Sequence, residues 1–157
     1  MNATTARISY EDFEVGRVRI LGPRLVTREE IIEFATEFDP QPMHLDEEAA
    51  NKSMLKGLSA SGWHTCAIMM RMLFDGLIED SNSLGAPGVD ETRWIRPVRP
   101  GDQLTMHMTC VEKREMKSRP HVGIVRHKME MKNQNGETVM DGSWPGMFAK
   151  RNPGQTA

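Results

Sequence analysis

The chain has 157 residues, which is enough for one domain with a buried core and few for two. Its formal net charge is −2 with acidic and basic residues well mixed, so the composition does not indicate a nucleic-acid-binding surface. The longest apolar stretch, from Cys66 to Leu77, is interrupted by Arg71 and Asp75 and is too short to span a bilayer. We therefore expect a single domain over residues 1–157 that binds neither nucleic acid nor membrane.

The N-terminus and the cysteines predict the compartment. The first residues, MNATTARISYEDFEVG, lack the apolar segment of a signal peptide. The two cysteines, Cys66 and Cys110, lie far apart in apolar surroundings, with neither a metal-binding nor a redox spacing. A reduced cytoplasmic protein is the simplest interpretation.

Helical signals dominate the first half of the chain after an initial strand. Thr27, followed by Glu30 three residues later, has the spacing of a helix-capping box, and Pro40 forces Asp39 out of the helical region. From Gly62 onwards apolar residues occupy nearly every side of a segment, as in a buried helix. The expected elements are a strand over 17–26 interrupted by a Gly-Pro pair, and helices over 28–38, 47–51 and 62–74, the last ended by Gly76.

The second half has the patterns of strands. Apolar and polar residues alternate in several segments, and Asn135-Gly136 has the composition of a hairpin turn. The expected strands cover 88–98, 104–112, 121–131 and 138–149. This order predicts an α+β fold, in which an antiparallel sheet of about five strands wraps around one long central helix.

The stretch FDPQPMHLD, residues 38–46, holds the strongest candidates for chemistry. Pro40 and Pro42 leave this segment few conformations, so Asp39 and His44 can be held at a fixed separation in a rigid loop. A histidine titrates near neutral pH, and a desolvated carboxyl can have its pKa raised enough to share proton transfer with it. The alternative is an ordinary Asp-Pro turn that ends a helix.

Gly62 opens the expected buried helix. Its amide is one of the N–H groups that lack an intrahelical acceptor, and such groups can donate to a polarised or anionic oxygen. Every helix start offers such donors, so the Gly62 amide indicates a functional site only if an acid/base pair lies nearby.

Three stretches of the chain resemble the MaoC-like dehydratases, the (R)-specific enoyl-CoA hydratases of the hot dog fold. They are FATEFDPQPMHLDEEAA, GLSASGWHTCAIM and RWIRPVRPGDQLTM, and with the element order the resemblance covers roughly residues 10 to 150. It implies that Asp39 and His44 are the catalytic pair and that the amide of Gly62 polarises a thioester carbonyl. The implied activity is that of a hydro-lyase, which adds water to a trans-2-enoyl-CoA to give an (R)-3-hydroxyacyl-CoA, or runs in reverse.

The resemblance also implies partners. The substrate carries coenzyme A, no separate cofactor or metal is expected, and the molecule is a homodimer joined through sheet edges, or a dimer of such dimers. Residues expected to contact the substrate are Ser61, Trp63, Trp94 and Arg96. Trp63 is a wall of the acyl pocket or a dimer contact, and Arg93, Arg96 and Arg99 meet coenzyme A phosphates or are simply solvated.

The chain departs from the family pattern at three positions. Gln41 stands where asparagine is usual, Ser61 where a histidine commonly precedes the glycine, and Met70 where some members have a serine. These departures concern the surroundings of the Asp39/His44 pair and leave the pair itself unchanged.

The sequence gives little support to two other kinds of site. A metal site made of Asp39, His44, Asp46 and His64 lacks a recognised ligand spacing. His64 and Cys66 are two residues apart on one helix, so they point to different faces and are a poor nucleophilic pair.

Two rival functions remain open. A hot dog acyl-CoA thioesterase would need a catalytic acid or nucleophile on the central helix, where residues 62–73 offer no carboxylate. A non-catalytic acyl-CoA-binding or dimer-partner subunit would make the Asp39/His44 pair dispensable.

Overall fold

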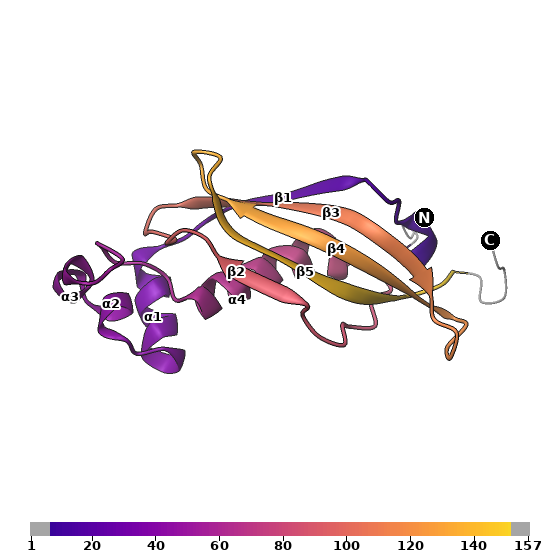
Figure 1. Ribbon diagram of the computed structural model, residues 1–157, viewed down its shortest axis with the longest axis horizontal. Coiled ribbons are helices and arrows are strands. Elements are labelled where there is room, and N and C mark those ends of the chain that lie inside the picture. Colours follow the sequence, from indigo (N-terminus) through magenta and orange to yellow (C-terminus); the bar gives the residue numbers. More distant parts are fainter. Residues whose placement is uncertain (1–6, 152–157) are drawn as a thin grey trace, which may run out of the picture.

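The structure is a computed structural model that describes residues 7–151. Its strands form one five-stranded antiparallel sheet in the order β1-β3-β4-β5-β2, with helix α4 lying along the sheet (Figure 1). The predicted α+β arrangement, a sheet around a central helix, is confirmed. Residues 1–6, which begin the N-terminal stretch discussed above, and 152–157 lie outside the described residues, and the domain limits 1–157 stay a prediction.

The elements follow the expected order, although two short helices are added and one strand is much shorter than expected. The strands are β1 (Val18–Leu25), β2 (Glu91–Trp94), β3 (Gln103–Glu115), β4 (Val122–Lys132) and β5 (Thr138–Ala149). The helices are η1 (Tyr10–Asp12), α1 (Arg28–Phe38), α2 (Pro42–Leu45), α3 (Glu47–Lys52), α4 (Gly62–Leu73) and η2 (Phe74–Ile78). Helices α1 to α3 gather at one end of the molecule, beside the start of α4 (Figure 1).

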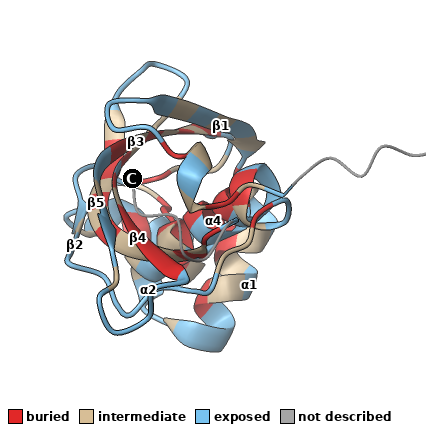
Figure 2. Ribbon diagram, turned by 90° about the vertical axis from the view of Figure 1, so that its right-hand side faces the viewer, coloured by how far each residue is buried: buried red, intermediate tan, exposed pale blue. Residues whose placement is uncertain are grey.

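The core lies between the concave face of the sheet and α4, where the buried residues concentrate (Figure 2). Methionines supply much of it; those below 2 % exposure are Met106, Met108, Met129, Met131 and Met140. An unbranched thioether adapts to irregular space, and burying such a side chain contributes roughly 1.5–3 kcal/mol. Within residues 7–151, no helix has both the length and the apolar character that crossing a bilayer requires.

Strand β2 is shorter than the predicted strand 88–98. The amides of Ile95 and Arg96 both donate to the carbonyl of Val139, so the regular ladder with β5 stops at Trp94. The chain then leaves the sheet, and residues 95–98 become available to line a cavity.

The prediction that Gly76 ends the central helix was wrong. The helix continues through this glycine as the π-helical turn η2. A Cβ at Gly76 would lie 2.5 Å from Cδ2 of Leu21, so the glycine permits close packing against β1 and does not terminate the helix.

The prediction of a rigid loop around His44 was also wrong. Pro42 occupies the first turn of the short helix α2, where its missing N–H costs nothing, and His44 lies on this helix.

The predicted capping box at the start of α1 is only half formed. Thr27 Oγ accepts from the Glu30 amide as expected, but the Glu30 carboxylate pairs with Arg24 and does not complete the box.

Candidate functional site

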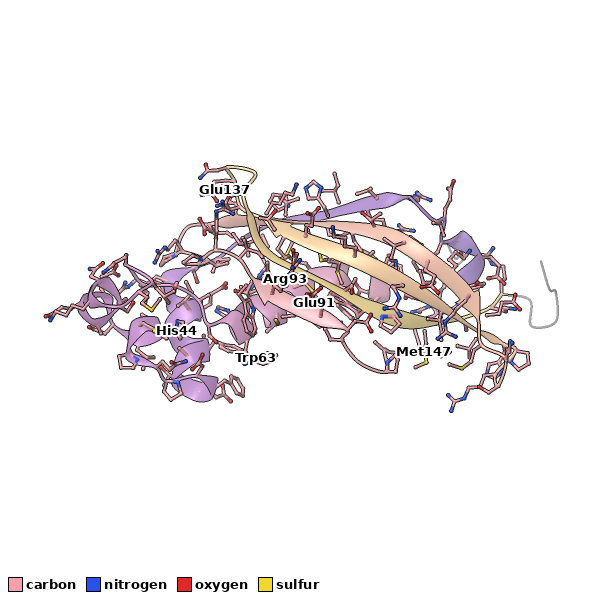
Figure 3. All side chains as sticks on the ribbon, viewed as in Figure 1. His44, Trp63, Glu91, Arg93, Glu137 and Met147 are labelled. Atoms are coloured by element: carbon pink, nitrogen blue, oxygen red, sulfur yellow. The ribbon has the colours of Figure 1, made fainter. Side chains whose placement is uncertain are left out.

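A cavity of about 420 Å³ lies where the helical end of the molecule meets β2 and the start of α4. Asp39, His44, Gly62 and Trp94 all line it, although they come from four separate segments of the chain. Figure 3 shows His44 within the helical end and Trp63 close to the same region. The structure therefore brings the predicted site residues together.

Asp39 is placed by the end of α1. Its amide donates to the carbonyl of Ala35 at 3.0 Å, which makes it the C-cap residue. Its carboxylate accepts two hydrogen bonds, from Gln41 Nε2 to Oδ1 at 2.8 Å and from Ser61 Oγ to Oδ2 at 2.6 Å. The glutamine and serine that depart from the family pattern are therefore the groups that hold this carboxylate.

His44 is buried, with 5 % of its surface exposed. Its Nδ1 lies 2.8 Å from the carbonyl oxygen of Ser59, and because a carbonyl only accepts, Nδ1 carries the proton of that bond. In the neutral ring the lone pair is then on Nε2, which lies 3.6 Å from Asp39 Oδ2. The main chain thus selects the tautomer that faces the carboxylate and the cavity.

The charge on Asp39 is stabilised. The hydrogen bond from Ser61 lowers the pKa of Asp39 most; burial opposes it, and the Gln41 amide and His44 lower the pKa further. The expectation that desolvation raises this pKa was therefore wrong, because hydrogen bonds to the charged form outweigh burial. Asp39 is an anchored carboxylate.

The start of α4 lies against this carboxylate. Ser61 is the N-cap, and its Oγ accepts from the Trp63 amide at 3.3 Å while donating to Asp39. Gly62 is the first residue of the helix, so its amide has no intrahelical acceptor. A Cβ on Gly62 would lie 2.4 Å from Cε2 of Trp94, so only glycine allows the indole to pack there.

Trp63 and Trp94 form an exposed aromatic edge of the cavity. Their rings meet edge to face with centroids 5.4 Å apart, and they are 64 % and 48 % exposed. Both line the cavity, and their contact with substrate stays a prediction.

The three arginines considered for coenzyme A phosphates differ in their partners. Arg96 lines the cavity, and its guanidinium donates to the Thr138 carbonyl at 3.2 Å. Arg93 makes two bonds of 2.9 Å to Asp141. Arg99 instead donates to main-chain carbonyls of the segment before α4.

The other candidate residues have structural partners. Asp46 caps α3 by accepting from the Ala49 amide at 2.8 Å, and His64 stacks on Phe34 with ring centroids 4.7 Å apart. Cys66 contacts the sulfur of Met140 at 3.8 Å, on a different face of α4 from His64. In the described part of the chain, no three His, Cys, Asp or Glu side chains are grouped to hold a metal ion.

The site contains interactions that the sequence did not indicate. The bond from Ser61 to Asp39 spans 22 positions, and that from His44 to the Ser59 carbonyl spans 15. A serine directly before a helix start is a common N-cap, so a local signal could have indicated the cap at Ser61 but not its bond to Asp39.

Comparison with known proteins assigns the family. A sequence model described as MaoC like domain matches residues 13–133 of this chain. The chain belongs to the MaoC-like dehydratase family. The resemblance inferred from the three motifs is thereby confirmed.

Solved structures of similar proteins share this hot dog fold across most of their length, and a sequence relative matches over most of its own. The MaoC-like dehydratase from Rhodospirillum rubrum is 39% identical with a TM-score of 0.85, covering 92% of this chain and 99% of that one. The R-hydratase PhaJ1 from Pseudomonas aeruginosa is 24% identical with a TM-score of 0.73, covering 93% and 88%, a likeness that shows the fold alone. The uncharacterised protein YdeM of Bacillus subtilis (strain 168) is 30% identical, over 86% of this chain and 94% of its own.

Proposed function

We propose that this MaoC-like protein adds water to short or medium trans-2-enoyl-CoA thioesters, giving (R)-3-hydroxyacyl-CoA, and catalyses the reverse dehydration. The observation that carries the proposal is the approach of His44 Nε2 to Asp39 Oδ2, at 3.6 Å, in a cavity that also contains the first amide of α4. Membership of the MaoC-like family supports the reaction class.

His44 is the group suited to move the proton. Its Nε2 bears the lone pair in the tautomer that Ser59 selects, whereas Asp39 is held as a carboxylate with a lowered pKa. A water molecule that donates one hydrogen to each group would be oriented towards the substrate. As its oxygen bonds to C3, one proton passes to His44, and Asp39 stabilises the imidazolium.

The electrons of the C2–C3 double bond then move onto the thioester. The carbonyl oxygen becomes enolate-like, and the amide of Gly62 donates to it from the positive end of α4. Collapse of this enolate takes a proton at C2, which the Asp39/His44 pair returns. The elements of water are thus added without an oxidant, a reductant or a metal.

The remaining residues serve binding in this proposal. Trp63 and Trp94 are walls for the acyl thioester, and Arg96 meets the coenzyme A portion. Ser61 acts through Asp39, by the bond of 2.6 Å to its carboxylate. No cofactor is required beyond the coenzyme A of the substrate.

A homodimer is also proposed. Strand β2 pairs with β5 on one side and is an edge of the sheet, and most of its residues are exposed. An unpaired edge readily accepts another strand, so a second copy can extend the sheet across a two-fold axis, and two such dimers can associate.

The proposed compartment is a reducing cytoplasm. The free thiols of Cys66 and Cys110 fit such a compartment.

Absorbance of crotonyl-CoA at its enoyl band tests the reaction. We expect wild type to remove the band, and Asp39→Asn and His44→Ala to lower the rate by about 10² or more while remaining folded. Release of free thiol from a saturated acyl-CoA without hydration would establish the rival thioesterase. Acyl-CoA binding without either reaction would establish a non-catalytic subunit.

A further inference from the structure

Arg99 lies outside the catalytic pair but reaches the segment that supports it. It follows the β2 edge in sequence and is only partly exposed. Its Nη1 donates to the carbonyls of Gly57 at 2.6 Å and Leu58 at 3.3 Å, and its Nη2 donates to the carbonyl of Leu55. One guanidinium therefore holds three carbonyls of a single turn, a task suited to a planar group with several fixed donors.

The turn held by Arg99 has an unusual backbone. Lys56 has φ of 54° and Gly57 has φ of 148°, so two successive residues lie at positive φ. A left-handed conformation at a residue with a side chain persists only where its surroundings enforce it. A Cβ on Gly57 would also lie 3.0 Å from Nη1 of Arg99, so the turn and the guanidinium are closely fitted.

Arg99 is itself fixed from the sheet side. Its amide donates to Asp102 Oδ2 at 2.7 Å, and Asp102 Oδ1 accepts from Gln134 at 3.1 Å. The carbonyl of the preceding residue, Val98, accepts from the amide of Ala60 at 2.9 Å. The segment 98–102 is thus a rigid support on which residues 55–60 rest.

The segment that Arg99 supports makes a hydrogen bond to His44. Leu58, whose carbonyl Arg99 binds, directly precedes Ser59, whose carbonyl accepts from His44 Nδ1 at 2.8 Å. A displacement of this carbonyl rotates the imidazole or releases its tautomer, and misplacement by about 1 Å can cost roughly 10²-fold in rate. We propose that Arg99 is a positioning residue, which fixes the orientation and tautomer of His44 through the turn Leu55–Ser59.

This inference rests on the proposed hydratase, so its test has one readout with activity and one without. Arg99→Met removes all the guanidinium bonds, and Arg99→Lys keeps the charge with a single donor group. Arg71→Met is the matched control, since Arg71 is exposed and pairs with Asp75 at the far end of α4. Thermal unfolding first establishes which variants are folded, and Arg99→Lys serves if Arg99→Met is not.

For Arg99→Met we expect kcat on crotonyl-CoA to fall about 10- to 100-fold with KM changed much less, an intermediate fall for Arg99→Lys, and no change for Arg71→Met. Long-range ¹H–¹⁵N spectra of the imidazole should show the Nδ1–H tautomer of His44 in wild type and its loss or mixing in Arg99→Met. A folded Arg99→Met with unchanged kcat and an unchanged His44 tautomer would overturn the proposal. If wild type lacks hydratase activity, the proposed function fails while the spectra still decide the role of Arg99.

Discussion

The two ends of α4 carry cavities of similar size and different chemistry. The cavity at its N-terminus measures about 420 Å³ and contains Asp39 and His44. The cavity at its C-terminal end measures about 370 Å³ and is lined mainly by apolar side chains, among them Leu73 and Phe148, together with His127. Each cavity therefore holds one buried histidine, and the two can be compared directly.

The two histidines are equally buried, at 5 % exposure for His44 and 4 % for His127, yet their surroundings differ. His44 has a main-chain acceptor on Nδ1 and a carboxylate near Nε2. His127 packs edge to face on Phe13 at 5.5 Å, and burial lowers its pKa to about 4. Burial, together with the nearby charge of Arg19, keeps His127 a neutral packing group, whereas the Ser59 carbonyl and the Asp39 carboxylate orient the ring of His44.

The largest expected effect is a difference in kcat when the same substitution is made at each of the two histidines. His44→Gln should lower kcat on crotonyl-CoA by about 10²- to 10⁴-fold, because the amide cannot take a proton from water. His127→Gln should keep most activity per folded molecule. Steady-state rates normalised to folded protein measure both, and equal losses would contradict the assignment of the site to the N-terminal end of α4.

A pair of glycine substitutions sharpens the comparison. Gly62→Ala places a methyl group against the Trp94 ring and should both destabilise the fold by about 1–3 kcal/mol and reduce kcat, since the helix start or the indole must move. Gly76→Ala meets the tip of the Leu21 side chain, which can shift, and should leave kcat unchanged. Denaturant unfolding and kinetics test this pair, and a Gly62→Ala variant with unchanged stability and kcat would contradict the close fit of Trp94 against the start of α4.

A serine pair tests the charge on Asp39. Ser61→Ala removes the strongest cause of the lowered Asp39 pKa, so this pKa should rise towards its ordinary value. The pKa of Asp39, measured from the pH dependence of its side-chain ¹³C shift, should therefore be higher in Ser61→Ala than in wild type. Ser83→Ala, in the opposite cavity, should leave the Asp39 pKa unchanged; an Asp39 pKa that is also unchanged in Ser61→Ala would show that the bond from Ser61 does not lower it.

The smallest effect concerns stability at the C-terminal end. His127 has a folded pKa of about 4 against an ordinary value of 6.5, so between these pH values the unfolded chain binds more protons. The free energy of unfolding should therefore fall as pH drops through this window and be insensitive to this residue above it. His127→Gln should make the dependence shallower by up to about 1.4 kcal/mol per pH unit, measured by urea unfolding; an unchanged slope would mean that the ring binds its proton equally well in the folded and the unfolded chain.

Much of the fold followed from local patterns. Helix Arg28–Phe38 and strand Thr138–Ala149 have the predicted bounds, because a capping residue, helical spacing and a hairpin turn act within a few positions. The end of β2 and the continuation of the helix through Gly76 did not follow. They depend on the Val139 carbonyl and on packing against Leu21, both distant in sequence.

The sequence by itself determined the family, the element order and the candidate pair Asp39 and His44. Each of these depends on short motifs or local patterns, whose residues are close together along the chain. Only the tertiary structure decided the chemical state of that pair. Ser61 lowers the pKa of Asp39 and the Ser59 carbonyl selects the tautomer of His44, through bonds that close only when α4 packs beside α1 and α2. Hydrogen-bond partners set protonation, and no local pattern records partners that folding brings from 15 to 22 positions away.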